Sequence, residues 1–199
     1  MKETIRVSFL SNDEIRQKVE GFRKTYWNNS VPVEIEDIID LKLKINIIPI
    51  PGLQDLCDTI TLITSGWDSI YVDNKIFSDE RYLNRLRFSF AHEVGHYILH
   101  KHIYETLNIK NIENFYKFFE IITPEQYGYL EAQANKFANF LLVPRDMLAK
   151  EKEKIMKSTK NLFDINSIDK NTLNSYISRP LSNIFGVSDT TIEIALNQN

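Results

Sequence analysis

Apolar residues near the start of the chain recur at the three- and four-residue spacing of an amphipathic helix. Ser11 and Glu14 have the spacing of a capping box, in which each side chain bonds the backbone N–H of the other residue. The apolar positions that follow are Ile15, Val19, Phe22 and Tyr26. This pattern predicts a first helix over about residues 11–28. Pro32 opens a second predicted helix, whose apolar face contains Ile35, Ile38, Ile39 and Leu41.

Three short runs rich in β-branched residues follow and predict a small sheet. The first run covers residues 45–50 and stops where Pro51-Gly52 breaks it. Residues 59–63 and 69–72 predict two further strands. The sequence Ser65-Gly66-Trp67-Asp68 between them is suited to a hairpin turn.

Helical spacing returns near residue 80. A helix is predicted from Glu80 to His100, with apolar positions at Leu83, Leu86, Phe90, Val94, Tyr97 and Ile98. A short helix is expected over residues 112–119. The sequence Thr123-Pro124-Glu125-Gln126 then combines an N-cap, a proline at the first helical position and a capping box, which predicts a strong helix over residues 124–142 that ends near Pro144.

The remaining residues, 145–199, also have a helical pattern, and the charged run at 150–154 is interpreted as a solvated face. We therefore predict an α+β fold that is mostly helical. A domain over residues 1–150 contains a small three-stranded sheet beside the helix at 80–100. A helical segment over residues 151–199 is expected to pack on that domain.

Composition and charge narrow the possible functions. The chain has 199 residues and 43% hydrophobic content, enough for one sizeable core. It contains no apolar run suited to a bilayer and no apolar segment behind a basic start, so we expect a soluble, cytoplasmic protein with no membrane partner. A net charge of -3 gives no general attraction to nucleic acid. Cys57 is the single cysteine, and its apolar setting does not favour a thiol hydrolase.

All four histidines lie at positions 92, 96, 100 and 102. His92 and His96 frame an HExxH sequence, and residues four apart share one face of a helix. Two imidazoles placed in this way can hold one metal ion, and Glu93 between them can take a proton from a bound water. This pattern predicts the site of a zinc peptidase.

A catalytic zinc site needs a third protein ligand and one open position. His102 has the spacing of the third histidine in HExxHxxGxxH peptidases, but Leu99 occupies the position where those proteins need glycine. His100 lies one turn beyond His96, too far along the helix to reach the same ion, so both His100 and His102 are expected either at the surface or behind the metal ligands. Glu131 is the favoured third ligand, with Asn135 one turn later available to bond a ring nitrogen of a ligand histidine. Ala134 and Ala138 would let the two helices approach closely.

Two blocks of sequence resemble the ImmA/IrrE family of metallopeptidases: RFSFAHEVGHYILH at residues 87–100 and EAQANKFANFLLVP at residues 131–144. The segments IPIPGL at 48–53 and IYVD at 70–73 are similar to the β-region of that family. The resemblance implies a zincin-like fold, with His92, His96 and Glu131 as metal ligands and Glu93 as the catalytic base. It implies one Zn²⁺ per chain, although Mn²⁺ or Fe²⁺ could occupy such a site. It also implies a narrow protein substrate, a helix-turn-helix repressor whose cleavage turns on genes of a mobile element or a stress response.

Other functions stay open at this point. Residues 179–193 resemble the turn of a helix-turn-helix, which would suit a DNA-binding regulator. However, a recognition helix starting at Ser188 would carry Asp189 and Glu193 and no basic residue, so a packing or partner-docking role is favoured. A protein that holds metal and partner without cutting is a further alternative. If the chain is a peptidase, we expect its substrate to lie extended along an edge strand at residues 69–73.

Overall fold

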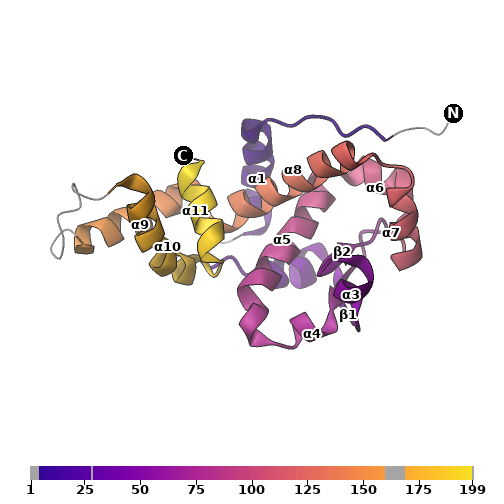
Figure 1. Ribbon diagram of the computed structural model, residues 1–199, viewed down its shortest axis with the longest axis horizontal. Helices are drawn as coiled ribbons and strands as arrows, with labels where there is room; N and C mark the ends of the chain where they lie inside the picture. The colour runs from indigo at the N-terminus through magenta and orange to yellow at the C-terminus, as the bar shows by residue number, and fades with distance from the viewer. Residues whose placement is uncertain (1–4, 28, 160–168, 199) are drawn as a thin grey trace.

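The computed structural model describes residues 5–27, 29–159 and 169–198 (Figure 1). Helix α1 (Asn12–Tyr26) begins at the predicted capping box, in which Ser11 and Glu14 exchange side-chain to backbone hydrogen bonds. Ile15, Val19 and Phe22 are buried on its inner face. The predicted end at residue 28 lies outside the described residues.

The second helix begins three residues later than Pro32 and changes its winding. Helix α2 (Ile35–Asp37) is one short turn that continues into η1 (Ile38–Leu43), a π-helix. The three isoleucines of the predicted apolar face are buried, whereas Leu41 is 54% exposed. A π-helix has more residues per turn than an α-helix, so the buried face has rotated away from Leu41.

The sheet has three strands, β1 (Asn46–Ile50), β2 (Thr61–Ile63) and β3 (Ser69–Asp73), in the order β1-β3-β2. Strand β3 is parallel to β1 and antiparallel to β2. It is therefore the middle strand, and the prediction of an edge strand at 69–73 for substrate is wrong because both of its sides are already paired. Strand β2 is the edge that lies against the HExxH helix.

Two short helices beside the sheet were not predicted: α3 (Leu53–Cys57) and α4 (Asn74–Phe77). Asp73 fastens both of them. Its carboxylate accepts hydrogen bonds from the backbone N–H groups of Lys75 and Ile76 at the start of α4, and from that of Gln54 in α3. Burial alone would raise the pKa of Asp73, but these three donors outweigh it and the pKa is lowered.

The predicted helix at 80–100 is a 3₁₀ turn, η2 (Glu80–Tyr82), followed by α5 (Leu83–Leu99). Two shorter helices follow, α6 (Lys101–Leu107), which was not predicted, and α7 (Ile112–Phe119). Helix α8 (Pro124–Leu142) starts at the N-cap Thr123, as its sequence predicts. The Gln126 side chain does not turn back to complete a capping box, because it accepts a hydrogen bond from the Val7 N–H instead.

Helices α5 and α8 pack against each other at the centre of the molecule (Figure 1). The last three helices are α9 (Arg145–Thr159), α10 (Lys170–Phe185) and α11 (Asp189–Asn197). Amide and guanidinium groups of α5 and α8 bond the main chain at the α10–α11 turn and in α11: Asn84 to Val187, Arg87 to Gly186 and Asn139 to Thr191. One hydrophobic cluster extends from Val7 to Leu196. The fold is α+β and mostly helical, as the sequence predicts.

No helix within the three described ranges is long and apolar enough to cross a membrane.

Candidate metal centre

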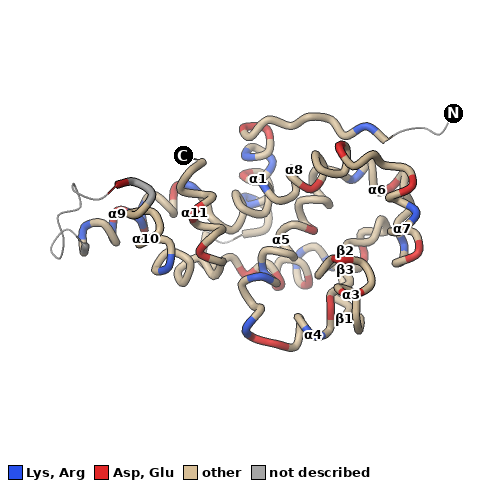
Figure 2. Tube along the Cα trace, viewed as in Figure 1, with Lys and Arg blue, Asp and Glu red and all other residues tan. Residues whose placement is uncertain are grey.

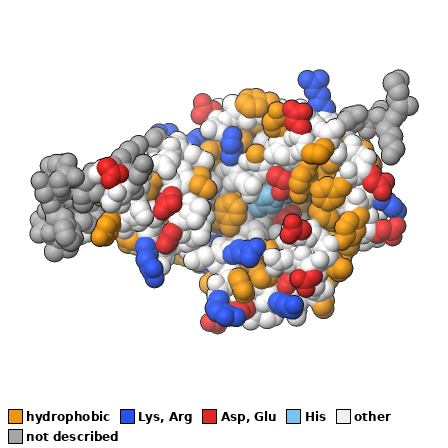
Figure 3. Space-filling model, in the orientation of Figure 1, with side chains coloured by type: hydrophobic (Ala, Val, Ile, Leu, Met, Phe, Trp, Pro, Cys, Tyr) orange, Lys and Arg blue, Asp and Glu red, His pale blue; other side chains and the backbone are white. Residues whose placement is uncertain are grey.

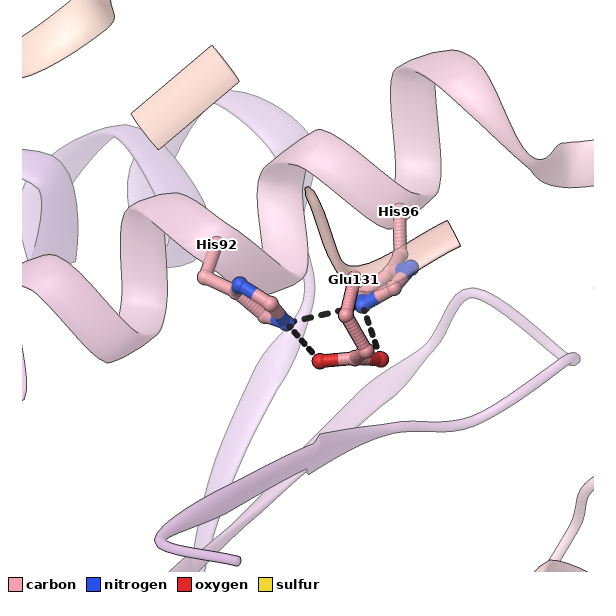
Figure 4. A group of neighbouring side chains, drawn as sticks. All are labelled: His92, His96 and Glu131. Carbon is pink, nitrogen blue, oxygen red and sulfur yellow. Dashed lines mark hydrogen bonds and ion pairs between the residues drawn. The ribbon is translucent and has the colours of Figure 1, made fainter. Parts of the chain in front are cut away.

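Three side chains converge where α5 and α8 cross (Figure 4). His92 and His96 project from adjacent turns of α5, and Glu131 projects from α8 between the two rings. One ligand atom from each of the three lies within 4.8 Å of the others. The His92 Nε2 atom is 3.2 Å from one Glu131 carboxylate oxygen, and the His96 Nε2 atom is 3.5 Å from the other. Neutral imidazole nitrogens and a carboxylate oxygen are donors that zinc accepts, so this set fits a three-ligand metal site.

Glycine at position 95 permits this close crossing. A Cβ atom at Gly95 would lie 3.1 Å from both the Cα and the carbonyl oxygen of Ala134, and 3.2 Å from the Cβ of Phe137. Ala134 therefore lies opposite Gly95, at the point where the two helix backbones are near each other. The small residues bring Glu131 of α8 within reach of the histidines on α5.

Opposite charge stabilises the carboxylate at this crossing. Burial alone would raise the pKa of Glu131, but hydrogen bonds to His92 and His96 hold that pKa well below its usual range. Burial alone would lower the pKa of His92, but the Glu131 and Glu93 carboxylates outweigh it and the pKa is raised. The site therefore presents an ionised carboxylate to the two rings, as a divalent cation requires.

The other ring nitrogens of the two histidines are also bonded. The His92 Nδ1 atom lies 2.9 Å from the Asn135 side-chain oxygen, so Asn135 contacts a ring of the histidine pair. The His96 Nδ1 atom lies 3.0 Å from His100 Nδ1. His100 is 1% exposed, and burial followed by the neighbouring His96 lowers its pKa to about 3. His102 is exposed on α6 and takes no part in this group.

Glu93 lies beside the three converging groups and is fixed by the edge strand β2. One carboxylate oxygen accepts a hydrogen bond of 2.8 Å from the Thr61 hydroxyl, and the other accepts one of 2.9 Å from the Ile63 N–H. The side chain is 4% exposed. The residue types do not reveal these contacts, because one is made by a backbone N–H and the other depends on how the strand packs against α5.

Tyr127 and Tyr104 face the site, whereas Tyr97 and Tyr129 do not, although both are close to the ligands in sequence. Burial, then the Glu131 and Glu93 carboxylates, raise the pKa of Tyr127. Tyr104 is buried with its ring 5.2 Å from that of His96. In contrast, Tyr97 packs against Trp67, and Tyr129 is exposed and bonds Glu125.

A cavity of about 240 Å³ opens onto these groups. His92, Glu93, Glu131 and Asn135 line one side, and the chain from Asp58 to Thr61 lines another. In Figure 3 a histidine side chain is visible in a recess, with acidic side chains next to it and a cluster of apolar side chains along one margin. The His92 and Glu131 side chains are therefore partly exposed, at 15% and 29%.

A family model described as the IrrE N-terminal-like domain, a peptidase family, matches residues 77–197, which include His92, Glu93, His96 and Glu131. The fold is similar to that of a Mycobacterium tuberculosis transcriptional regulator, with a TM-score of 0.50 and 13% sequence identity over 91% of this chain. The chain spans 55% of that protein, and the likeness is one of fold alone. Among curated proteins, no sequence matches. The family match covers more than half of the chain, and the protein therefore belongs to the IrrE N-terminal-like peptidase family, in agreement with the resemblance seen in its sequence.

Proposed function

We propose that this protein is a zinc-dependent endopeptidase. The observation that carries the proposal is that the His92, His96 and Glu131 side chains converge beside a cavity that His92, Glu131 and Glu93 line. Three protein ligands and a neighbouring carboxylate are the components that hydrolysis of a peptide bond requires at such a centre.

A zinc ion held by these residues would polarise the scissile carbonyl and lower the pKa of water at the site to about 7. Glu93 takes the proton of the attacking water and passes it to the leaving amine. The Thr61 hydroxyl and the Ile63 N–H hold the Glu93 carboxylate in one orientation, so that it does not need to reorganise during attack. The Tyr127 hydroxyl lies near both carboxylates and bonds Glu131, which makes it the candidate donor to the developing oxyanion.

The proposed substrate is a helix-turn-helix repressor, cut once to release the genes it controls. This rests on the family resemblance, and the similarity of the fold to that of a transcriptional regulator is compatible with it. We further propose that the substrate segment lies extended along residues 58–61, because that chain lines the cavity and leads into the edge strand β2.

The charges of α11 argue against direct DNA binding through the C-terminal helices. Figure 2 shows acidic and basic residues interspersed over the molecule, without a continuous basic face along α11. Residues 189–197 include Asp189 and Glu193 and no lysine or arginine. Phosphate contacts need positive charge, so we assign these helices to packing and partner docking.

The test is to load wild-type protein and a Glu93→Gln variant with zinc and incubate each with a panel of helix-turn-helix repressors. Mass spectrometry of the products should find a single cut in one repressor with wild type. The variant should keep its zinc and lose activity by a factor on the order of 10² to 10⁴. If both proteins bind a repressor and neither cuts it, the peptidase proposal is wrong and the protein is a scaffold that holds its partner.

A further inference from the structure

A chain of hydrogen bonds connects the N-terminal segment to one of the candidate metal ligands. The Gln133 side-chain Nε2 atom donates to the main-chain carbonyl of Ser8 at 2.9 Å. The Gln133 Oε1 atom lies 3.1 Å from His100 Nε2, and His100 Nδ1 lies 3.0 Å from His96 Nδ1. His96 then presents its Nε2 atom to Glu131.

The Ser8 carbonyl at one end of this series of hydrogen bonds determines which group donates and which accepts in each of the contacts. A carbonyl oxygen can only accept, so the Gln133 amide must turn its NH₂ group to Ser8 and its oxygen to His100. His100 must therefore carry its proton on Nε2, which leaves a lone pair on Nδ1. That lone pair can only accept, so His96 must carry a proton on Nδ1, and Nε2 is the ring nitrogen that faces Glu131 and would face a metal ion.

Burial removes the alternative partners for these groups. The exposed fractions are 5% for Gln133, 1% for His100 and 2% for His96. Because no water can exchange these bonds, reversing any one group would set two donors or two acceptors against each other and leave buried polar groups unsatisfied. His92 differs, because the partner of its Nδ1 atom is the exposed side chain of Asn135.

The N-terminal segment is itself held in place over α8. Its Val7 N–H donates to the Gln126 side chain at 2.6 Å, and Val7 is buried. The segment passes along α8 before α1 begins (Figure 1). The Ser8 carbonyl, at the outer end of the series of hydrogen bonds, is therefore held in position.

We propose that Gln133 and His100 are positioning residues which, together with the Ser8 carbonyl, hold His96 as its Nδ1–H tautomer and so direct its Nε2 atom to the metal. This inference rests on the proposed function in one respect, namely that His96 is a metal ligand. The tautomers themselves are properties of the metal-free protein and can be measured without catalysis.

The experiment uses full-length protein labelled with ¹⁵N in histidine, which gives signals from only four rings. Long-range ¹H–¹⁵N spectra of metal-free wild type at about pH 8, where an ordinary imidazole with pKa ~6.5 is neutral, report which ring nitrogen carries the proton. We expect Nδ1–H for His96 and Nε2–H for His100. The opposite tautomer at either ring in wild type would by itself overturn the inference, whether or not any variant folds.

Two variants of Gln133 separate this role from simple packing. Gln133→Met keeps the volume and loses both hydrogen bonds, so His96 should become a mixture of tautomers and zinc affinity should fall 10- to 100-fold. Gln133→Glu loses the bond to Ser8 and keeps an acceptor for His100, so it should retain the wild-type tautomers and most of the affinity. Equal spectra and affinity for Gln133→Met and wild type would refute the inference. Correct tautomers and tight zinc binding without any proteolysis would refute only the proposed function.

Discussion

Replacing Gly95 by alanine tests the helix crossing that forms the site, because two effects of known size oppose each other there. In a helix interior, glycine to alanine normally stabilises by about 1 kcal/mol. At Gly95, however, the new methyl group would lie 3.1 Å from Ala134 backbone atoms, and backbone cannot rotate aside as a side chain can. Overpacking of this kind costs about 1–3 kcal/mol, so the free energy of unfolding should fall by up to about 2 kcal/mol.

Gly21 provides the matched control. It lies inside α1, and a Cβ there would meet nothing within 4 Å, so Gly21→Ala should stabilise by about 1 kcal/mol. Both substitutions gain the same helix propensity, so the difference between their changes in unfolding free energy is the cost of overpacking at Gly95, about 1–3 kcal/mol. Urea unfolding of the metal-free proteins measures it, and zinc competition should find weaker binding for Gly95→Ala alone. Equal stabilisation by both substitutions would refute the close crossing.

Three further predictions concern residues around the site. Asp73→Asn should lower the free energy of unfolding by about 1–3 kcal/mol at pH 7. Because folding lowers the pKa of Asp73 from 3.8, this stabilisation is complete above that pH and is lost as the pH falls through the folded pKa. The melting temperatures of the variant and wild type should therefore converge in acid. A difference in melting temperature that does not depend on pH would contradict the assignment. Gly186→Ala should destabilise by at least about 1 kcal/mol in urea unfolding, since Gly186 has φ 61° and its Cβ would collide with the Arg87 guanidinium; unchanged stability would argue against this turn. Thr61→Val should lower kcat roughly 10-fold by releasing one side of Glu93 while zinc affinity stays constant, and a change confined to zinc affinity would count against this role.

The parts of this fold that sequence predicts are those set by neighbouring residues. The Ser11 capping box and the Thr123 N-cap are local features, and each lies at the helix start that its sequence indicates. The four-residue spacing of His92 and His96 likewise places both rings on one face of any helix that contains them. Glu131 comes from a separate helix, and its selection needed the zinc chemistry and the family resemblance in addition to the pattern.

The features that sequence did not predict depend on tertiary pairing. Strand order is one, since the run at 69–73 has the same character whether it is central or at an edge, and in the fold it is central. The contact of Gln126 with Val7 is another, because an alternative partner distant in sequence replaced the local capping bond. The partners of Glu93 and the connection from Ser8 to His96 use backbone groups, which every residue has, so no residue type indicates them.

The central claim is that His92, His96 and Glu131 together hold one metal ion, and metal content tests it most directly. Wild type, Glu131→Ala and Glu125→Ala would be purified without chelator or added metal and analysed for zinc, manganese and iron. Glu125 is the control because it is an exposed glutamate on the same helix. The account predicts about one zinc per chain in wild type and in Glu125→Ala, and a loss of that zinc in Glu131→Ala. Equal zinc in wild type and Glu131→Ala would contradict it.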